Sequence, residues 1–247
     1  LISPKLRKVG NPVALLRHVE DYTLRELDLR NEISGAHRLL EIRDEISSEF
    51  PMQRLRFPKY YTELSNKSVL VSEYVKGESL EEMIGQSSLS WDDLLELFRI
   101  HGAYMFGIGT FHGDLHPGNC IFDPDGNFVF IDNGAICEAP RNVSLPLFLF
   151  FEFLSKNELN SAFEALIGLA GKPPSEESKA RFRKQMSEIY RDFGHKSVGE
   201  QSLTDLMMKT VRVAVEEAGA DFGEEAFPII RSLMYMDGLV IRTHPEV

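Results

Sequence analysis

Apolar residues recur at helical spacing along the first fifth of the chain. Between Pro12 and about Ser48, Val, Leu, Ile and Ala return roughly every three or four residues. Asn11 suits the cap of a helix and Pro12 its first turn. Glycine weakens a helix interior, so the run can break near Ser34-Gly35. The pattern predicts one long helix or two consecutive helices that end before Phe50-Pro51.

The hydrophobic pattern then changes to that of strands. Phe57–Leu64 and Ser68–Tyr74 are short apolar or β-branched stretches, and Ser65–Lys67 between them has the composition of a turn. We expect an antiparallel pair. The chain leaves this sheet at Ser79, which is followed three residues later by Glu82, a pattern typical of the capping box that begins a helix.

A second helix and a hairpin follow. The segment from Ser90 to about Gly109 has a capping serine and a helical apolar pattern, and His101 in its middle is interpreted as structural. Cys120–Phe122 and Phe128–Ile131 are short apolar runs, and Asp123–Asn127 joins them with the residues of a tight turn. These runs predict a β-hairpin.

The rest of the chain is predicted to be helical. Residues 135–143 read as a short loop. The expected helices are Leu145–Ser155, Glu158–Gly168, Ser175–Gly194, Leu203–Ala218 and Glu224–Arg242. The most apolar stretch, Leu145–Leu154, is too short to span a bilayer and contains a glutamate, so it is interpreted as a buried helix. The fold class expected from these elements is α+β.

Composition and charge exclude some functions. The 247 residues carry a net charge of -11, which disfavours nucleic-acid binding through a basic face. Cys120 and Cys137 form no C-x-x-C pair, so zinc is not indicated, and both are expected to be buried. The chain begins at Leu1, which suggests a fragment or a processed product, and neither a signal peptide nor a transmembrane segment is visible.

The strongest chemical signal is the segment His112–Asn119, HGDLHPGN. Asp114 precedes Asn119 by five residues, and Asp132 follows the hairpin in the segment FIDNG. This order and spacing match the catalytic aspartate and the two magnesium ligands of the protein-kinase signature. Asp114 is therefore expected to orient or deprotonate an acceptor, and Asn119 and Asp132 to share Mg²⁺. A chance polar turn is the alternative, and the combined pattern disfavours it.

Other candidate residues have weaker signals. Asp28 and Glu32 are four residues apart and would share a helix face, which on pattern alone is a solvated acidic surface. Backbone groups at Glu73, Tyr74 and Val75 occupy the position of the hinge that meets adenine in a two-lobed kinase. The short segment after Gly134 lacks a substrate-docking loop and an A-P-E motif, which argues against an ordinary protein-substrate kinase.

Four segments carry a wider resemblance: ELDLRNE, SVLVSEYVKGESL, FHGDLHPGN and FIDNGA. Through them the whole chain resembles the UbiB family of atypical kinases, the aarF-domain proteins. Residues 231–239 also look like that family's C-terminal helix. The resemblance implies a protein kinase-like two-lobe fold. Residues 1–75 would form a truncated N-lobe, and residues 76–247 a mostly helical C-lobe.

The resemblance also implies roles for the acidic residues. Glu26 and Asp28 match the family's E-x-D pair, and Glu32 matches the carboxylate that pairs with an ATP-binding lysine. The catalytic aspartate, the magnesium asparagine and the magnesium aspartate fall on Asp114, Asn119 and Asp132. The implied cofactors are ATP and Mg²⁺.

The biological role implied by the family is isoprenoid quinone (ubiquinone) biosynthesis or related lipid homeostasis. An ATPase or small-molecule phosphotransferase is expected in preference to a protein kinase. The implied partners are a nucleotide, lipid or quinone precursors and quinone-biosynthesis proteins, without nucleic acid. The expected location is the cytoplasm or a membrane surface, mitochondrial or plastid in a eukaryote.

This sequence departs from the family pattern at two places. The K-x-G-Q segment, the nucleotide loop and the lysine that precede the acidic helix in the family are absent, which predicts weakened nucleotide binding and possible inactivity of this fragment. Asn133 stands where phenylalanine usually follows the metal aspartate. Two alternatives therefore stay open: an aminoglycoside or choline kinase-like phosphotransferase, and a pseudokinase scaffold. His112 is expected to support the loop, and the role of His116 is left open.

Overall fold

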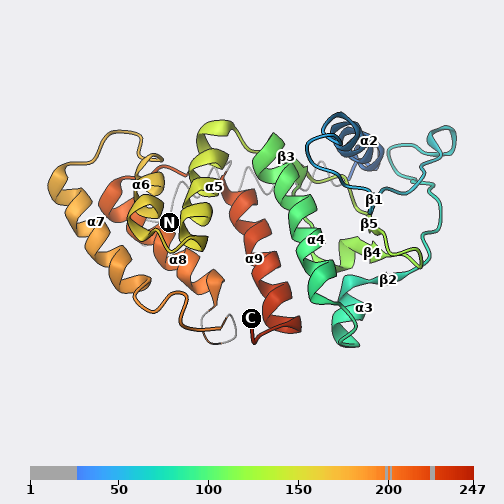
Figure 1. The fold of residues 1–247 in the computed structure, drawn as a ribbon. Coiled ribbons are helices and arrows are strands. Elements are labelled where there is room, and N and C mark those ends of the chain that lie inside the picture. The colour runs from blue at the N-terminus through green and yellow to red at the C-terminus, as the bar shows by residue number, and fades with distance from the viewer. Residues whose placement is uncertain (1–26, 198–199, 201, 223–225) are drawn as a thin grey trace, which may run out of the picture. The chain divides into compact units, whose positions relative to one another are not determined.

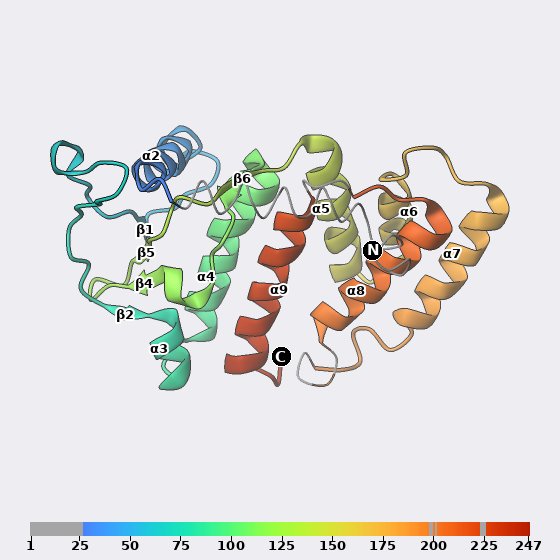
Figure 2. The same cartoon turned by 180° about the vertical axis from the view of Figure 1, so that it is seen from behind.

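The computed structural model describes residues 27–197, 200, 202–222 and 226–247. Its elements fall into two compact units, which are drawn in Figure 1 and from behind in Figure 2. The first unit comprises Leu1–Gly77 and Ile121–Ile136, and the second comprises Glu78–Cys120 and Cys137–Val247. The chain thus returns to the first unit for the hairpin that precedes Asp132.

Among its described residues, the first unit combines helix α2 with three short strands. Helix α2 spans Arg30–Glu45, and the strands are β1 (Leu55–Arg56), β4 (Cys120–Phe122) and β5 (Phe128–Phe130). Strand β5 lies between β1 and β4, and its three residues are buried. Strand β1 pairs parallel with β5, with Leu55 opposite Phe128. The core of this unit packs the buried face of α2, including Leu39 and Ile42, with these strands.

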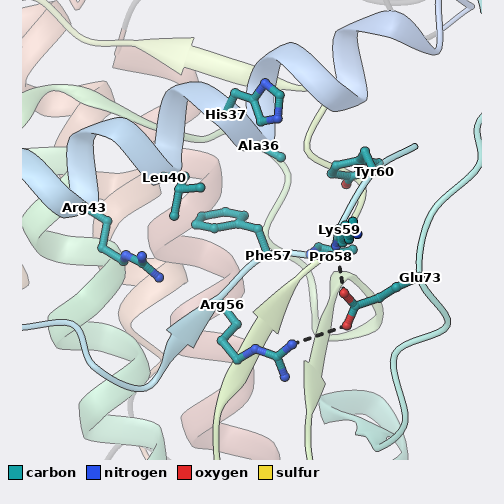
Figure 3. A pocket seen from close by; sticks show the side chains of 10 residues that line it. All are labelled: Ala36, His37, Leu40, Arg43, Arg56, Phe57, Pro58, Lys59, Tyr60 and Glu73. Atoms are coloured by element: carbon teal, nitrogen blue, oxygen red, sulfur yellow. Dashed lines mark hydrogen bonds and ion pairs between the residues drawn. The ribbon is translucent and has the colours of Figure 1, made fainter. Parts of the chain in front are cut away.

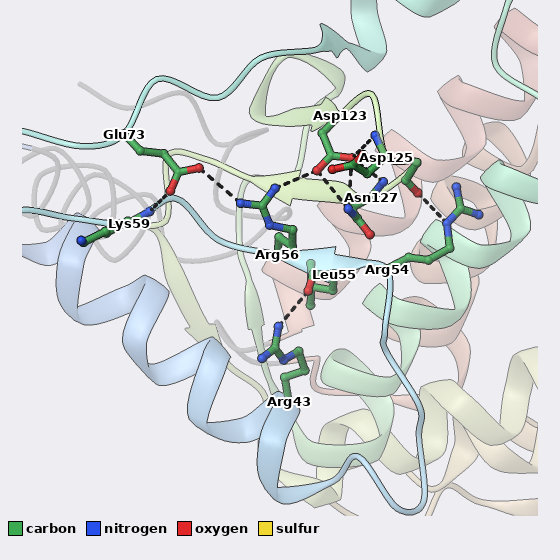
Figure 4. A network of polar contacts seen from close by, with 10 residues as sticks. Arg43, Arg54, Leu55, Arg56, Lys59, Glu73, Asp123, Asp125 and Asn127 are labelled. Atoms are coloured by element: carbon green, nitrogen blue, oxygen red, sulfur yellow. Dashed lines mark hydrogen bonds and ion pairs between the residues drawn. The ribbon is translucent and has the colours of Figure 1, made fainter.

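The predicted hairpin is confirmed, and its turn is held by one buried carboxylate. Asp123 accepts hydrogen bonds from the backbone N–H groups of Asp125 (3.0 Å) and Asn127 (2.8 Å) and from the guanidinium of Arg56 (2.8 Å). Figure 4 shows these contacts, with Arg56 bridging Asp123 and Glu73. Burial alone would raise the pKa of Asp123, but the bonds from Asn127, Arg56 and the backbone outweigh it and lower the pKa.

The predicted helix through Asp28 is wrong, because α2 begins at Arg30. The Asp28 side chain accepts hydrogen bonds from the backbone N–H (3.3 Å) and the side chain of Arg30, so it competes with a helical backbone there. Of the alternatives that the sequence left open, a break near Ser34-Gly35 does not occur, since α2 continues through both residues. The upstream part of the prediction, residues 12–26, lies outside the described residues.

The two predicted strands 57–64 and 68–74 are not regular strands. Their antiparallel direction is right: around the bridge Tyr60–Ser72, the N–H of Tyr61 donates to the carbonyl of Val71 (2.9 Å) and the N–H of Glu73 to that of Lys59 (2.8 Å). Residues 62–64, however, form a 3₁₀ turn. Side chains add to this short backbone pairing: Ser65 Oγ accepts from the Val71 N–H (3.0 Å) and the Glu73 carboxylate from the Lys59 N–H (2.9 Å). Strand β1, which precedes this pair, was not predicted.

The second unit is mostly helical. Helix α4 (Trp91–Gly102) continues into a wider π-helical turn at Ala103–Ile108, and helix α8 (Leu203–Val213) continues into another at Ala214–Ala218. The Ser79 capping box and the Ser90 cap are confirmed. In both views α9 lies between α4 and α5 (Figures 1 and 2). The other elements are β2 (Glu78–Ser79), α3 (Leu80–Gly85), α4 (Trp91–Gly102), β3 (Thr110–His112), a 3₁₀ turn (Pro117–Asn119), β6 (Ile136–Glu138), α5 (Arg141–Ser155), α6 (Leu159–Ile167), α7 (Glu176–Ile189), α8 (Leu203–Val213) and α9 (Ala226–Thr243).

Two local predictions for this unit are wrong. Residues 135–143 are not a loop, because β6 pairs with β3 and α5 already begins at Arg141. The N–H of Ala139 donates to the carbonyl of Gly109 (2.7 Å), which extends the pairing of β6 with β3. Cys137 is half-buried, whereas Cys120 is buried as expected. None of the helices in the part of the chain that the structure describes has both the length and the apolar character needed to cross a membrane.

Helix α9 connects distant parts of the second unit through polar contacts. Asp237 is 4% exposed and accepts hydrogen bonds from the N–H groups of Leu203 (3.2 Å) and Thr204 (2.8 Å) and from the hydroxyls of Ser202 and Thr204. It therefore caps the beginning of α8 from another helix. Near its own end, α9 pairs Arg242 with Glu81 of α3 (2.6 Å).

His101 makes the folding stability depend on pH. It is 2% exposed, packs edge-on against Phe111, and neither ring nitrogen has a hydrogen-bond partner among the described residues. Burial, and secondarily the nearby His112, lowers its pKa from 6.5 to about 3. The unfolded chain therefore takes up a proton near pH 6.5, and the folded chain does so only near pH 3. Stability is lost as pH falls through this window.

We expect His101→Leu to remove that part of the acid sensitivity. Urea titrations at several pH values between 7.5 and 5 measure the effect. As the pH falls, the free energy of unfolding of the wild-type chain should decrease by up to about 1.4 kcal/mol per pH unit more than that of the variant. The exposed His37 provides the control, because His37→Leu should keep the wild-type slope. Equal pH slopes for wild type and His101→Leu would contradict the assignment.

Candidate active site

The loop His112–Asn119 is fixed by hydrogen bonds within itself. The buried His112 accepts the Asp114 N–H at Nδ1 (3.2 Å), which confirms the predicted supporting role of this histidine. Asn119 donates its side-chain amide to the Asp114 carbonyl (3.0 Å), so the two residues are brought together. His116 accepts the Gly118 N–H at Nδ1 (3.0 Å) and begins the 3₁₀ turn. The Asp114 carboxylate is left half-buried on a fixed backbone.

Helix α9 contacts the same loop from the far end of the sequence. The hydroxyl of Tyr235 donates to Asp114 Oδ1 (3.0 Å), and Arg231 donates to the carbonyl of Gly113. The His116 ring lies edge-on to the Tyr235 ring, with centroids 6.4 Å apart. Burial, then the charge of Asp114, raises the pKa of Tyr235, so its hydroxyl is a donor at neutral pH. No local sequence pattern indicates either contact, since Tyr235 and Asp114 are 121 residues apart.

Asp132 belongs to the first unit, where it lies beside Glu32. It follows β5 and has a left-handed backbone (φ 57°), which is uncommon outside glycine and often marks a functional residue. Glu32 of α2 is 7% exposed and accepts the Gly134 N–H at Oε1 (3.0 Å). Burial, then the nearby Asp132 carboxylate, raises the pKa of Glu32. The structure thus brings two carboxyl groups together at the end of the hairpin.

Asn133 joins three segments of the first unit. It is fully buried, and its side-chain amide donates to the carbonyl of Phe130 (2.9 Å) and to the hydroxyl of Tyr60 (3.2 Å). Its backbone carbonyl oxygen lies against Gly35 of α2, and a β-carbon added at residue 35 would come within 1.9 Å of that oxygen. The side chain that stands in place of the usual phenylalanine therefore links the end of the hairpin to Tyr60, and the backbone of the same residue packs against α2.

Among the described residues, the other predicted site residues make contacts apart from those of Asp114 and Glu32. Glu26 lies outside the described residues. Asp28 pairs with Arg30 (2.6 Å), which lowers the pKa of Asp28 to about 2, and it does not share the helical face of Glu32. The side chain of Glu73 is held by Arg56 and the Lys59 N–H. Tyr74 is 87% exposed and Val75 is half-buried.

A cavity of about 320 Å³ lies between α2 and residues 56–60 in the first unit (Figure 3). Arg43, Arg56 and Lys59 line it, which at first suggests an anion site. Carboxylates already neutralise both guanidinium groups, however: Arg43 pairs with Asp44 (2.8 Å), and Arg56 bridges the two acids shown in Figure 4. We therefore do not assign a phosphate to this cavity.

Comparison with known proteins identifies the family. A model of the ABC1 atypical kinase-like domain matches residues 1–166, which is more than half of the chain. The chain belongs to this family. The ABC1 domain match includes α2, the loop His112–Asn119 and the hairpin that ends at Asp132, so the candidate site lies within the matched region.

Individual ABC1 relatives agree with the family match. A protein of Glaesserella parasuis named "Probable protein kinase UbiB" is 24% identical over 99% of this chain and 45% of its own length. An aarF domain-containing protein kinase of Arabidopsis thaliana, described as chloroplastic, is 25% identical over 76% of this chain and 26% of its own length. The chain therefore spans less than half the length of these relatives.

A solved structure confirms the fold. The Mycobacterium tuberculosis protein described as the complex of Rv3197 with erythromycin aligns with 95% of this chain and 59% of its own, at a TM-score of 0.59 and 17% identity. At that identity the similarity speaks for the fold alone. The α+β, kinase-like fold class predicted from the sequence is thus confirmed, as is the resemblance to the UbiB family.

Proposed function

We propose that this chain is a Mg-ATP-dependent phosphotransferase or ATPase domain of the ABC1 type. The observation that carries the proposal is the fixed loop around Asp114. Asn119 and His112 hold the Asp114 backbone, and the carboxylate is left half-buried at the surface of the second unit. Phosphoryl transfer mainly requires positioned groups and charge neutralisation, so a rigidly held carboxylate is suited to orient or deprotonate an acceptor hydroxyl.

The residues proposed as metal ligands fit Mg²⁺ chemically. Asn119 and Asp132 supply an amide and a carboxylate oxygen, and Mg²⁺ is typically held by one or two protein oxygens together with water and substrate phosphates. The described residues contain no group of three or more His, Cys, Asp or Glu side chains able to hold a metal by themselves. Glu32 lies buried beside Asp132, and a bound cation would favour the charged form of both carboxyl groups. A bound Mg²⁺ would neutralise phosphate charge.

Nucleotide recognition is proposed for the first unit. Backbone groups at Glu73, Tyr74 and Val75 would meet the adenine, and Glu32, with the pair Glu26 and Asp28, would influence the phosphates. Glu32 is already supported by the Gly134 N–H, so its position does not depend on a lysine partner. This contact supports a formed site in the residues present.

The names of the relatives support a wider proposal. The relatives are named as UbiB kinases, and the resemblance to that family implies a role in quinone biosynthesis. We therefore propose lipid or isoprenoid quinone precursors as acceptors or effectors, and quinone-biosynthesis proteins as partners. We propose a cytoplasmic or membrane-peripheral location, with a plastid or mitochondrion as the eukaryotic counterpart, in line with the chloroplastic relative.

Thermal unfolding with ADP tests the nucleotide site. With millimolar ADP and Mg²⁺ we expect the melting temperature of the wild-type chain to rise, because a ligand at about 100 times its Kd stabilises by about 2.7 kcal/mol. Asp132→Ala should abolish the magnesium-dependent part of this rise. Asp125→Ala, an exposed carboxylate in the turn of the same hairpin, should retain it. An unchanged melting temperature of the wild-type chain would instead favour the pseudokinase scaffold.

A further inference from the structure

Two groups of α9 contact the Asp114 loop, and the proposed chemistry does not yet account for either. Tyr235 donates its hydroxyl to Asp114 Oδ1 (3.0 Å), and Arg231, one turn earlier, donates to the carbonyl of Gly113. One contact is to the reacting side chain and the other to the backbone that carries it. Helix α9 therefore restrains both the side chain and the main chain of the loop.

The same helix is itself firmly held in the second unit. Asp237 accepts hydrogen bonds at the beginning of α8, and Arg242 pairs with Glu81 of α3. The His244 ring packs edge-on against Trp91 of α4, with centroids 5.4 Å apart. Because α9 is fixed at several points along its length, its contacts with the loop define the position of Asp114 relative to the helical part of this unit.

We propose that Tyr235 is a positioning residue for Asp114. The Tyr235 hydroxyl donates a hydrogen bond to Oδ1 of Asp114, which fixes the rotation of the carboxylate. Oδ2 of Asp114 is then left to contact an acceptor hydroxyl or water. A hydrogen bond to a charged group is among the stronger ones in proteins, and a misdirected base slows the chemical step without changing nucleotide binding. The proposal rests on the catalytic role of Asp114 proposed above.

The test compares Tyr235→Phe with Tyr190→Phe in a phosphate-release assay with Mg-ATP. Tyr235→Phe should lower kcat about tenfold and leave the KM for ATP and the melting temperature unchanged. Tyr190 bonds the hydroxyl of Thr210 (2.8 Å) in the buried core of the same unit, so Tyr190→Phe should lower the melting temperature and leave kcat unchanged. Combined with Asp114→Asn, Tyr235→Phe should cause little further loss, since the two residues act as one unit.

Hydrogen exchange provides a readout that does not need turnover. Exchange at the amides of residues 113–119 should accelerate in Tyr235→Phe and stay unchanged in Tyr190→Phe. If Asp114→Asn retains full turnover, the proposed function fails and the role of Tyr235 fails with it. If Asp114→Asn is inactive and Tyr235→Phe has normal turnover, only the role of Tyr235 is overturned. Faster turnover in Tyr235→Phe would also overturn it, because the tyrosine would then be blocking the place of the acceptor.

Discussion

Alanine at position 35 is expected to lower the melting temperature by up to about 8 °C, although alanine is the better helix former. Gly35 lies within α2, and a β-carbon there would come within 1.9 Å of the Asn133 carbonyl oxygen and 3.1 Å of Ile136 Cγ1. The nearest atom belongs to the backbone, so relief requires α2 or the end of the hairpin to move. Overpacking of this kind costs about 1–3 kcal/mol or more, against about 1 kcal/mol gained from helix propensity.

The displacement should also disturb the site. Glu32 lies on the same helix, one turn before Gly35, and its bond to the Gly134 N–H (3.0 Å) depends on the close approach of these segments. Gly238 of α9 is the matched control, because it is also inside a helix and nothing lies within 4 Å of the added β-carbon. Gly238→Ala should raise the melting temperature slightly. If both variants are stabilised to the same extent, the packing role of Gly35 is disproved.

Gly35 also illustrates where sequence reasoning fails. Helix propensity treated this glycine as a possible break, whereas the helix is continuous and the glycine allows another segment to approach. The partner, Asn133, lies almost a hundred residues later, so no local pattern indicates the contact. In the sequence, Asn133 is visible only as a departure from the usual phenylalanine. Its bonds to Phe130 and Tyr60 are long-range polar interactions that a single sequence does not reveal.

The features that could be predicted depend on neighbours in the sequence. The Ser79 capping box and the Asp123–Asn127 turn are closed by hydrogen bonds between residues two to four apart, so their residue types are sufficient evidence. The strands predicted around Tyr60 and Ser72 are less regular because a 3₁₀ turn at residues 62–64 interrupts the first of them, and side chains supply part of the pairing. The spacing within HGDLHPGN placed Asp114 and Asn119 in one loop, but the contact from Tyr235 depends on the tertiary fold.

Asparagine at position 114 is expected to lower ATP turnover by about 10²–10⁴-fold, the usual range for loss of a general base. The variant keeps the size of the side chain, and its amide oxygen can still accept the hydroxyl of Tyr235. The bond from Asn119 goes to the backbone carbonyl of residue 114, so the loop should keep its conformation. We therefore expect an unchanged melting temperature and an unchanged KM for ATP, with the loss confined to kcat.

Phosphate release from Mg-ATP, measured alongside thermal unfolding, separates a chemical effect from a structural one. Asp92→Asn is a suitable control, because this exposed carboxylate lies in the first turn of α4, outside the candidate site, and its loss should leave turnover unchanged. Turnover of Asp114→Asn within a few-fold of wild type would show that Asp114 is not the base. A lowered melting temperature would indicate a structural role for the carboxylate, since its contact with Tyr235 is the one that asparagine alters most directly. Loss of turnover in a chain that melts normally would place the chemistry at the Asp114 carboxylate.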